Sequence, residues 1–314
     1  ILSVIQDRSV VRELVDSEPW LYLVSLNRAE VGLAQSVQRL KQSPHPLPRI
    51  DVEKAIGWVE QRLGIELASR QQEALRQACE HKLLVITGGP GVGKTTLVQS
   101  ILEIFSAKQM KCVLAAPTGR ATKRLAETTQ RSAKTIHRLL DFNPATGEFK
   151  RNAKRPLTGD LFVLDETSMV DVVLGHQFLR AVPNEACVIL VGDVDQLPSV
   201  GPGSVLADLI NSQAVPVVRL TEIFRQASQS QIVTAAYAIN NGQMPNLTTP
   251  EELTDFYFVE CEEPEAIQGM LVRLVKDRIP ARFGCDPKSD IQVLTPMNRS
   301  LHLMVQDPST KGAV

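Results

Sequence analysis

The stretch Leu83–Thr96, LLVITGGPGVGKTT, decides the fold that this sequence predicts. Its first five residues form an apolar run, which is typical of a parallel strand buried on both faces. Gly88–Thr95 then match the pattern GxxxxGK[ST], and an apolar helical run follows through Leu97 and Ile101. Because glycines let the backbone wrap, loop N–H groups and the helix N-terminus can face a phosphate group. We therefore predict a phosphate-binding loop between a strand and a helix; an ordinary glycine-rich turn is the alternative.

The polar residues of this loop each have a use in phosphate chemistry. Lys94 adds a point charge for the phosphates, and the hydroxyl of Thr95 suits Mg²⁺. We predict that the loop binds a nucleoside triphosphate together with Mg²⁺. The candidate nucleotide-binding residues are Gly89, Pro90, Gly91, Val92, Gly93, Lys94, Thr95 and Thr96.

Two adjacent acids follow another apolar run, Leu161–Leu164. Such a pair lies at the carboxyl end of a buried strand, which is the edge where parallel sheets bind ligands. There Asp165 can hold Mg²⁺ and Glu166 can take the proton of an attacking water, as hydrolysis requires. The alternative is a strand end followed by a helix cap, since Asp165, Glu166 and Thr167 all suit helix starts.

Short β-rich runs alternate with helical patterns through the middle of the chain. The predicted strands are Leu83–Thr87, Cys112–Ala116, Leu161–Asp165, Cys187–Val191 and Val217–Leu220. This alternation predicts an α/β fold with a parallel sheet covered by helices on both faces, over residues 65–225. Turn residues within Asn143–Gly147 separate two short arms and predict an inserted β-hairpin at about 142–156.

The two ends of the chain predict further domains. A proline-rich linker at Pro44–Pro48 precedes a helix over 51–63, and we predict a small helical domain over 1–64. Beyond Arg225, we predict helices near 229–241 and 265–278 and strands at Phe256–Glu260 and Ile291–Thr295. They indicate a second α/β unit over 226–314 that the chain leaves incomplete, and residues 301–314 receive no assignment.

The composition is that of an ordinary globular chain. Of 314 residues, 43% are hydrophobic and 22% are charged, and no uncharged apolar run is long enough to span a bilayer, so we predict no membrane association. Five cysteines lie far apart without a CxxC pair, which favours a reducing compartment, and we expect a cytoplasmic protein. The chain opens on Ile1 with charged residues close behind, so we expect it to start inside a longer protein.

Charge is distributed unevenly along the sequence. The net charge of the chain is −1, but residues 108–155 hold 12 basic and 3 acidic side chains. Such a segment can attract the phosphates of a nucleic acid and release their counterions. The alternative is a solvated face of unrelated helices.

Five further strings occur in a fixed order around these sites. They are AAPTGRA at 115–121, TIHRLL at 135–140, LDETSMVD at 164–171, GDVDQLPSVG at 192–201 and LTEIFRQ at 220–226. Together with LASRQQEA at 67–74, they resemble the successive motifs of RecD-like DNA helicases of superfamily 1, and the resemblance covers most of residues 20–245. It implies a RecA-like fold for residues 65–225 and ATP as the nucleotide.

The resemblance also implies roles for single residues. Gln71 resembles a glutamine that reads adenine, Gln196 one that senses the γ-phosphate, and Arg225 an arginine finger. With Lys94 and Glu166, the last two complete the predicted catalytic set. The alternatives are a surface helix residue for Gln71, a capping side chain for Gln196 and an ordinary ion-paired arginine for Arg225.

Contacts to DNA are implied within the basic segment. The residues that resemble single-strand contacts are Pro117, Thr118, Gly119, Arg120, Thr135, His137 and Arg138. Short polar side chains and loop N–H groups suit backbone phosphates, and an imidazole ring can stack on a base. The hairpin resembles the family's small inserted domain, which acts where duplex DNA parts. A structural histidine and an inert surface hairpin are the alternatives.

These resemblances imply an ATP-dependent helicase that moves 5′→3′ on single-stranded DNA and unwinds junctions of single- and double-stranded DNA. Nothing after Thr295–Arg299 continues the family pattern, so we expect this chain to lack the later motifs. We expect a monomer, with recombination or repair proteins as candidate partners. The alternative is a DNA-binding loader or regulatory subunit that uses ATP only as a switch. A P-loop kinase or GTPase would need a substrate pocket or a guanine-reading loop, and the sequence shows neither.

Overall fold

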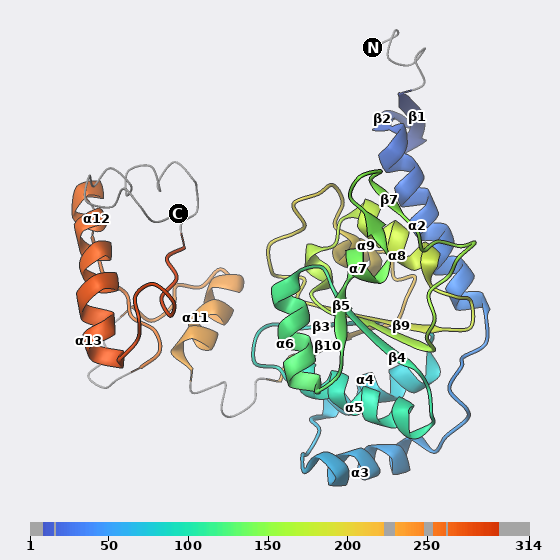
Figure 1. The fold of residues 1–314 in the computed structure, drawn as a ribbon, viewed down its shortest axis with the longest axis horizontal. Helices are drawn as coiled ribbons and strands as arrows, with labels where there is room; N and C mark the ends of the chain where they lie inside the picture. The colour runs from blue at the N-terminus through green and yellow to red at the C-terminus, as the bar shows by residue number, and fades with distance from the viewer. Residues whose placement is uncertain (1–8, 16, 223–229, 248–253, 262, 295–314) are drawn as a thin grey trace. The chain divides into compact units, whose positions relative to one another are not determined.

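A computed structural model describes residues 9–15, 17–222, 230–247, 254–261 and 263–294, and it divides the chain into two compact units, Ile1–Pro245 and Asn246–Val314. The first unit is built around one sheet with helices on both faces (Figure 1). Among the described helices, none has the length and apolar character needed to cross a membrane.

Six strands, all parallel to their neighbours, form this sheet. Their order across the sheet is β10 (Val217–Arg219), β3 (Leu83–Thr87), β9 (Cys187–Gly192), β8 (Leu161–Leu164), β4 (Cys112–Ala116) and β5 (Ala133–Thr135). Every residue of β3, β8 and β9 is buried, as the continuous apolar runs predict. The predicted α/β parallel sheet is confirmed, and β5 is an additional edge strand.

Side chains of the strands point alternately into two core clusters. Leu84 and Ile86 join the cluster beneath α3 (Val52–Leu63), α4 (Ser69–Glu80), α5 (Lys94–Ala107) and α6 (Gly119–Thr129). Leu83 and Val85 join the cluster beneath α2 (Val24–Gln42), α7 (Ile136–Leu139), α8 (Val172–Ala181) and α9 (Val205–Asn211). Figure 1 shows these two helical layers on opposite sides of the sheet. The carboxyl ends of all six strands therefore meet at one edge.

The N-terminal segment differs from the purely helical prediction. β1 (Val10–Val15) and β2 (Glu18–Leu23) form an antiparallel hairpin before α2 begins. Ser17 takes the left-handed conformation that closes the turn, and β-branched Val10, Val11 and Val15 favour a strand over a helix. The helix predicted at 51–63 is confirmed as α3, with Asp51 capping it by accepting from the Lys54 N–H at 3.2 Å. Helices α2 and α3 pack against α8 and α5 in the same compact unit as the sheet.

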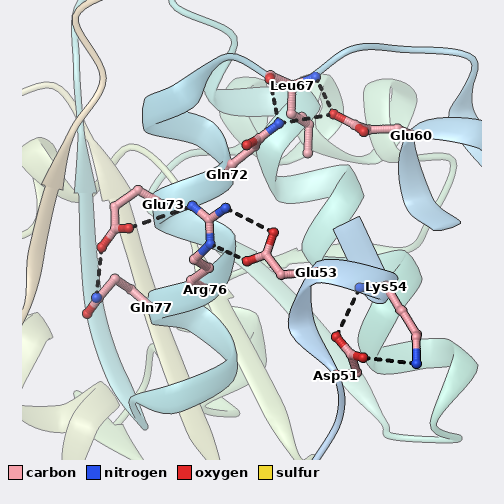
Figure 2. A network of polar contacts seen from close by, with 9 residues as sticks. All are labelled: Asp51, Glu53, Lys54, Glu60, Leu67, Gln72, Glu73, Arg76 and Gln77. Carbon is pink, nitrogen blue, oxygen red and sulfur yellow. Dashed lines mark hydrogen bonds and ion pairs between the residues drawn. The ribbon is translucent and has the colours of Figure 1, made fainter. Parts of the chain in front are cut away.

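Polar contacts hold α3 against α4 (Figure 2). Arg76 of α4 donates to both carboxylate oxygens of Glu53, at 2.7 and 3.2 Å. Nearer the C-terminal end of α3, Glu60 accepts from the backbone N–H of Leu67 at 2.9 Å and from the Gln72 amide at 3.4 Å. Because Leu67 and Gln72 flank the first residues of α4, this network fixes where α4 begins.

The predicted hairpin insertion is present. β6 (Phe142–Asn143) pairs antiparallel with β7 (Glu148–Phe149), and the Gly147 N–H donates to the Asn143 carbonyl across the turn at 2.9 Å. Gly147 has a φ of 69°, which glycine adopts without strain. The insertion is thus a short ribbon that follows α7.

The C-terminal part confirms the predicted helices and corrects the predicted strands. α11 (Gln231–Asn240) ends the first unit, and the second contains α12 (Pro264–Arg273), a π-helical turn η2 (Leu274–Arg278) and α13 (Ile279–Phe283). The strand expected at Phe256–Glu260 does not form, and no strand occurs at 291–294; Thr295 and residues 296–314 lie outside the described residues. A strand needs a hydrogen-bonding neighbour, and the described part of this unit offers none.

Candidate active site

The phosphate-binding loop joins β3 to α5 as predicted. Gly91 and Gly93 have φ values of 76° and 75°, in the left-handed region that glycine adopts without strain. At Gly88, a Cβ atom would lie 2.6 Å from the Leu220 carbonyl oxygen, so a larger residue would displace β10 or the loop. Gly93 is also the N-cap of α5, and the loop therefore wraps onto the N-terminus of that helix.

Lys94 is the first residue of α5 and turns back over the loop. Its Nζ donates to the carbonyl oxygens of Gly88 and Gly89, the latter at 2.8 Å. Burial lowers the pKa of Lys94, and the carboxylates of Asp193, Glu166 and Asp165 oppose that shift. The ammonium group is therefore held among acids at the mouth of the loop.

The two acids predicted at the end of β8 lie opposite this lysine. Asp165 Oδ1 accepts from the Glu166 N–H at 2.9 Å, and burial raises the pKa of Asp165. Burial, and then the charge of Asp165, raises the pKa of Glu166. Glu166 has a φ of 52°, a strained value for a residue with a side chain, which sets its direction at the strand end.

The end of β9 contributes a third acid. Asp193 is only 2% exposed and accepts from the Asp195 N–H at 3.1 Å and from the Gln196 amide at 3.4 Å. The backbone N–H of Gln196 also donates to the Asp193 carbonyl at 3.2 Å. This turn holds Gln196 beside the phosphate-binding loop.

One cavity of about 460 Å³ brings most of the predicted site together. It is lined by the loop residues Gly89–Thr96, by Asp165 and Glu166, which follow β8, and by Gln196 from the turn after β9. Its remaining wall comes largely from α6, through Arg124, Leu125 and Thr128. Strand ends β3, β8 and β9 thus position a cation, two carboxylates and an amide around one space.

Gln71 lies behind the loop instead of in the cavity. Its side chain is 1% exposed, its Oε1 accepts from the Ala68 N–H at 3.0 Å, and its Nε2 donates to the Gly93 carbonyl at 3.2 Å. The amide therefore joins the start of α4 to the last glycine of the loop. Its predicted contact with adenine stays a prediction, and Arg225, the predicted arginine finger, lies outside the described residues.

The predicted DNA contacts lie at the carboxyl ends of two paired strands, β4 and β5. Pro117 and Thr118 follow β4 and lead into Gly119 and Arg120 at the start of α6. Thr135 is the last residue of β5, and His137 and Arg138 lie in α7 directly after it. Thr118 Oγ1 caps α6 by accepting from the Ala121 N–H at 3.2 Å, and Thr135 Oγ1 caps α7 by accepting from the Arg138 N–H at 3.3 Å. Each threonine therefore caps a helix, in addition to the DNA contact predicted for it.

His137 packs against the hairpin. Its ring lies edge-on to Phe142 with centroids 5.2 Å apart, and it lies 5.6 Å from Phe149. The two phenylalanine rings are 4.9 Å apart. This three-ring cluster, His137–Phe142–Phe149, joins the β5 loop to both arms of the hairpin.

The basic side chains of residues 108–155 do not all lie at one edge of the sheet. Lys111 directly precedes β4 and Arg131 precedes β5, so both lie at the amino ends of their strands, away from Arg120 and Arg138. Arg131 is also paired with Glu103 at 2.9 Å. Only part of the segment's charge therefore lies at the predicted DNA loops.

Several known proteins are similar to this chain in sequence. Residues 71–202 match a family model described as an AAA domain. The ATP-dependent RecD2 DNA helicase of Deinococcus radiodurans is 38% identical over 225 residues, which cover 72% of this chain and 30% of that protein. The RecBCD enzyme subunit RecD of Mycobacterium tuberculosis is 34% identical over 306 residues, which cover 88% of this chain and 51% of that subunit. Over most of its length, the chain is homologous to the RecD and RecD2 proteins.

This chain spans only 30% and 51% of the lengths of those two curated relatives. Among solved structures, the Pif1 helicase from Candida albicans is 24% identical with a TM-score of 0.45, over 60% of this chain and 50% of that one.

Sequence reasoning missed two charged residues of the RecD-like site. Asp193 follows the buried strand β9 just as Asp165 follows β8, so the rule that located Asp165 could also have located Asp193. Arg124 stands in the second turn of α6 and belongs to no phosphate motif, so only the packing of α6 beside the loop reveals it.

Proposed function

We propose that this chain carries the first motor domain of an ATP-dependent DNA helicase that moves 5′→3′ on single-stranded DNA and unwinds junctions. The observation that carries the proposal is the cavity in which Lys94 meets the adjacent acids Asp165 and Glu166. The loops predicted to contact DNA leave the same edge of the sheet from β4 and β5. The direction of movement rests on the resemblance to RecD-like helicases.

The chain's own residues divide the work of hydrolysis. Loop N–H groups, the N-terminus of α5 and Lys94 bind the phosphates. Glu166 accepts the proton of the attacking water, and its raised pKa makes it a stronger base than an exposed glutamate. Gln196, held by Asp193, lies where it can contact the terminal phosphate.

The donor set fits Mg²⁺. This ion prefers oxygen ligands and is commonly held by one or two side chains together with phosphates and waters. Thr95 and Asp165 both line the cavity, and the Glu166 N–H orients the Asp165 carboxylate. We assign the ion to these two residues, where it would neutralise phosphate charge during hydrolysis.

We assign single-stranded DNA to the carboxyl ends of β4 and β5 and to the helix starts that follow them. The backbone N–H of Gly119 and the hydroxyls of Thr118 and Thr135 suit backbone phosphates, and Arg120 and Arg138 add charge. The hairpin β6–β7, attached through the cluster His137–Phe142–Phe149, would then lie at the junction with duplex DNA.

Because the chain spans only part of its relatives, we expect it alone to bind nucleotide, hydrolyse it slowly and unwind poorly. We propose that the motor works as a monomer or within a recombination or repair assembly. Robust unwinding by the purified 314-residue chain would contradict this expectation.

Replacing Glu166 with Gln tests the proposed hydrolysis. Because the amide cannot accept the proton, we expect turnover to fall by about 10²-fold or more, while nucleotide affinity stays within about twofold of the parent, a free-energy change under about 0.5 kcal/mol. ATPase rates with and without single-stranded DNA, and binding of a fluorescent ATP analogue, measure the two effects.

Glu80→Gln, at an exposed position near the end of α4, is the matched control and should change neither quantity. A motor shows turnover that DNA stimulates and that Glu166→Gln abolishes. Nucleotide binding without DNA-stimulated turnover in the parent chain would instead identify an ATP-switched loader.

A further inference from the structure

Helix α6 forms one wall of the nucleotide cavity. Arg124, Leu125 and Thr128 all line it. Leu125 is 2% exposed and anchors α6 in the core cluster beneath α5, which fixes the rotation of the helix. Arg124 and Thr128 are four residues apart, so they lie on the same face of α6. That face is the one turned toward the phosphate-binding loop.

Arg124 carries a charge that the described residues do not neutralise by an ion pair. Its neighbours on α6 and beyond behave differently, since Lys123 pairs with Glu127 at 3.9 Å and Arg131 pairs with Glu103 at 2.9 Å. Arg124 lines the same cavity as Lys94, Asp165 and Glu166, so its positive charge faces the space that these three groups surround.

Apart from Arg124, the acidic side chains around the cavity outnumber the basic ones, so an additional cation such as Arg124 would help to balance the charge of a bound nucleotide. Asp165, Glu166 and Asp193 bring three carboxylates to the strand ends, and Lys94 is the cation that faces them from the loop. A nucleoside triphosphate adds further negative charge at its terminal phosphate. A guanidinium group offers a planar fork of N–H donors that matches two phosphate oxygens, and it stays charged at all relevant pH values.

We propose that Arg124 contacts the terminal phosphate of the bound nucleoside triphosphate, so that α6 supplies a second phosphate-binding cation within the same domain. The inference deepens the proposed function and rests on nucleotide binding in this cavity. It makes Arg124 a residue that distinguishes a triphosphate from a diphosphate, because only the triphosphate presents a terminal phosphate on the side of Asp165 and Glu166.

The position of Arg124 on α6 also relates the nucleotide to the predicted DNA loop. Arg120, a predicted DNA contact, lies four residues earlier on the same face, about 6 Å away along the helix axis. Like charges at this spacing repel each other and destabilise a helix. One helix thus presents one arginine to each of the two proposed ligands.

Binding of a non-hydrolysable ATP analogue and of ADP, measured by fluorescence titration without DNA, tests the proposal. We expect Arg124→Ala to weaken binding of the analogue about tenfold, or about 1.4 kcal/mol, and to leave ADP affinity within about twofold of the parent, under about 0.5 kcal/mol. Arg124→Lys should recover part of the loss, because it keeps the charge without the fork.

Lys123→Ala is the matched control, since Lys123 is the adjacent cation on α6 and its ammonium group is paired with Glu127. We expect it to change neither affinity. Arg124 is exposed, so its replacement should leave the melting temperature within a few degrees of the parent. If Arg124→Ala fails to fold, Arg124→Lys decides the question, with a selective loss of analogue affinity supporting the proposal.

Two results would overturn the assignment of Arg124 while leaving the proposed function intact: equal losses for the analogue and ADP, or no loss for either in a parent chain that binds both. Failure of the proposed function looks different. In that case the parent chain binds neither nucleotide, or Lys94→Ala, which removes the loop cation, leaves both affinities unchanged.

Discussion

Asp165 illustrates how a functional carboxylate opposes folding. Burial raises its pKa, so the folded protein holds the charged form less favourably than the unfolded chain does. The resulting loss of folding stability is complete at pH values above the folded-state pKa of Asp165. It disappears at pH values below the unfolded-state pKa, near 3.8. The cavity therefore contains a group that lowers stability at neutral pH and stops doing so in acid.

We expect Asp165→Asn to raise the melting temperature of the nucleotide-free chain at neutral pH. Each kcal/mol gained in the free energy of unfolding raises the melting temperature by about 2–4 °C for a domain of this size. The gain should shrink steadily as the pH falls toward 4, because protonated aspartic acid and asparagine are both neutral. Calorimetric melts of the parent and variant across this range provide the measurement.

Asp195→Asn, at an exposed position two residues after Asp193, is the control and should show a much smaller gain. A gain from Asp165→Asn that stays constant with pH would show that shape, and not charge, is responsible.

The sequence predicted the position of single residues where they belong to a motif that adopts one known backbone geometry. The loop from Gly89 to Thr96 and the pair Asp165–Glu166 meet in the cavity, because strand ends in a parallel sheet share an edge. Gln71 shows the limit of this reasoning. Its residue type indicates an amide with a partner, but its bonds to Ala68 and Gly93 depend on how the start of α4 docks behind the loop.

At the scale of elements, the hairpin β6–β7 depends on its aromatic contacts. Phe149 contacts Phe142 and His137, and such aromatic pairs contribute about 0.5–1.5 kcal/mol each beyond area burial. The hairpin strands are only two residues long, and a two-stranded ribbon of this kind is marginal alone. The cluster therefore helps to hold the hairpin beside α7, together with the ion pair between Arg151 and Asp141 at 2.8 Å.

We expect Phe149→Ala to weaken single-stranded DNA binding by about threefold to tenfold, or about 0.7–1.4 kcal/mol, although Phe149 is not a predicted contact. The loss follows because His137 would no longer be supported in one orientation. Fluorescence anisotropy with a labelled oligonucleotide at fixed salt measures it.

Glu148→Ala changes the neighbouring residue of β7, which is exposed, and should not weaken binding. Unchanged affinity for Phe149→Ala would mean that the cluster supports the hairpin without supporting the DNA loop.

The sequence predicted a helix or strand correctly where the residues of that element themselves favour one type of secondary structure. The apolar runs of β3, β8 and β9 and the capped helix α3 have strong local signals. β5 is three residues with a central lysine, and only its pairing with β4 makes it a strand. The opposite error occurred at Phe256–Glu260, where an apolar run lacks a neighbouring strand among the described residues.

At the scale of the whole molecule, the sheet, both core clusters and the nucleotide cavity lie within residues 1–245. We expect residues 1–245 alone to fold and to bind the ATP analogue within about twofold of the full chain, a difference under about 0.5 kcal/mol. Thermal melting and fluorescence titration of the shortened chain measure the two properties. Failure to fold, or a loss of affinity above about tenfold, or about 1.4 kcal/mol, would show that residues 246–314 complete the site.

The order of strands has a mechanical consequence. β8, which directly precedes Asp165, and β4, which leads to Thr118, are direct neighbours, and adjacent strands lie only about 4.8 Å apart. Under the proposed function, the hydrolysis site and the predicted DNA-binding segment therefore lie at the ends of two adjacent strands. A shift of one strand end would then act directly on its neighbour, without a chain of intervening elements.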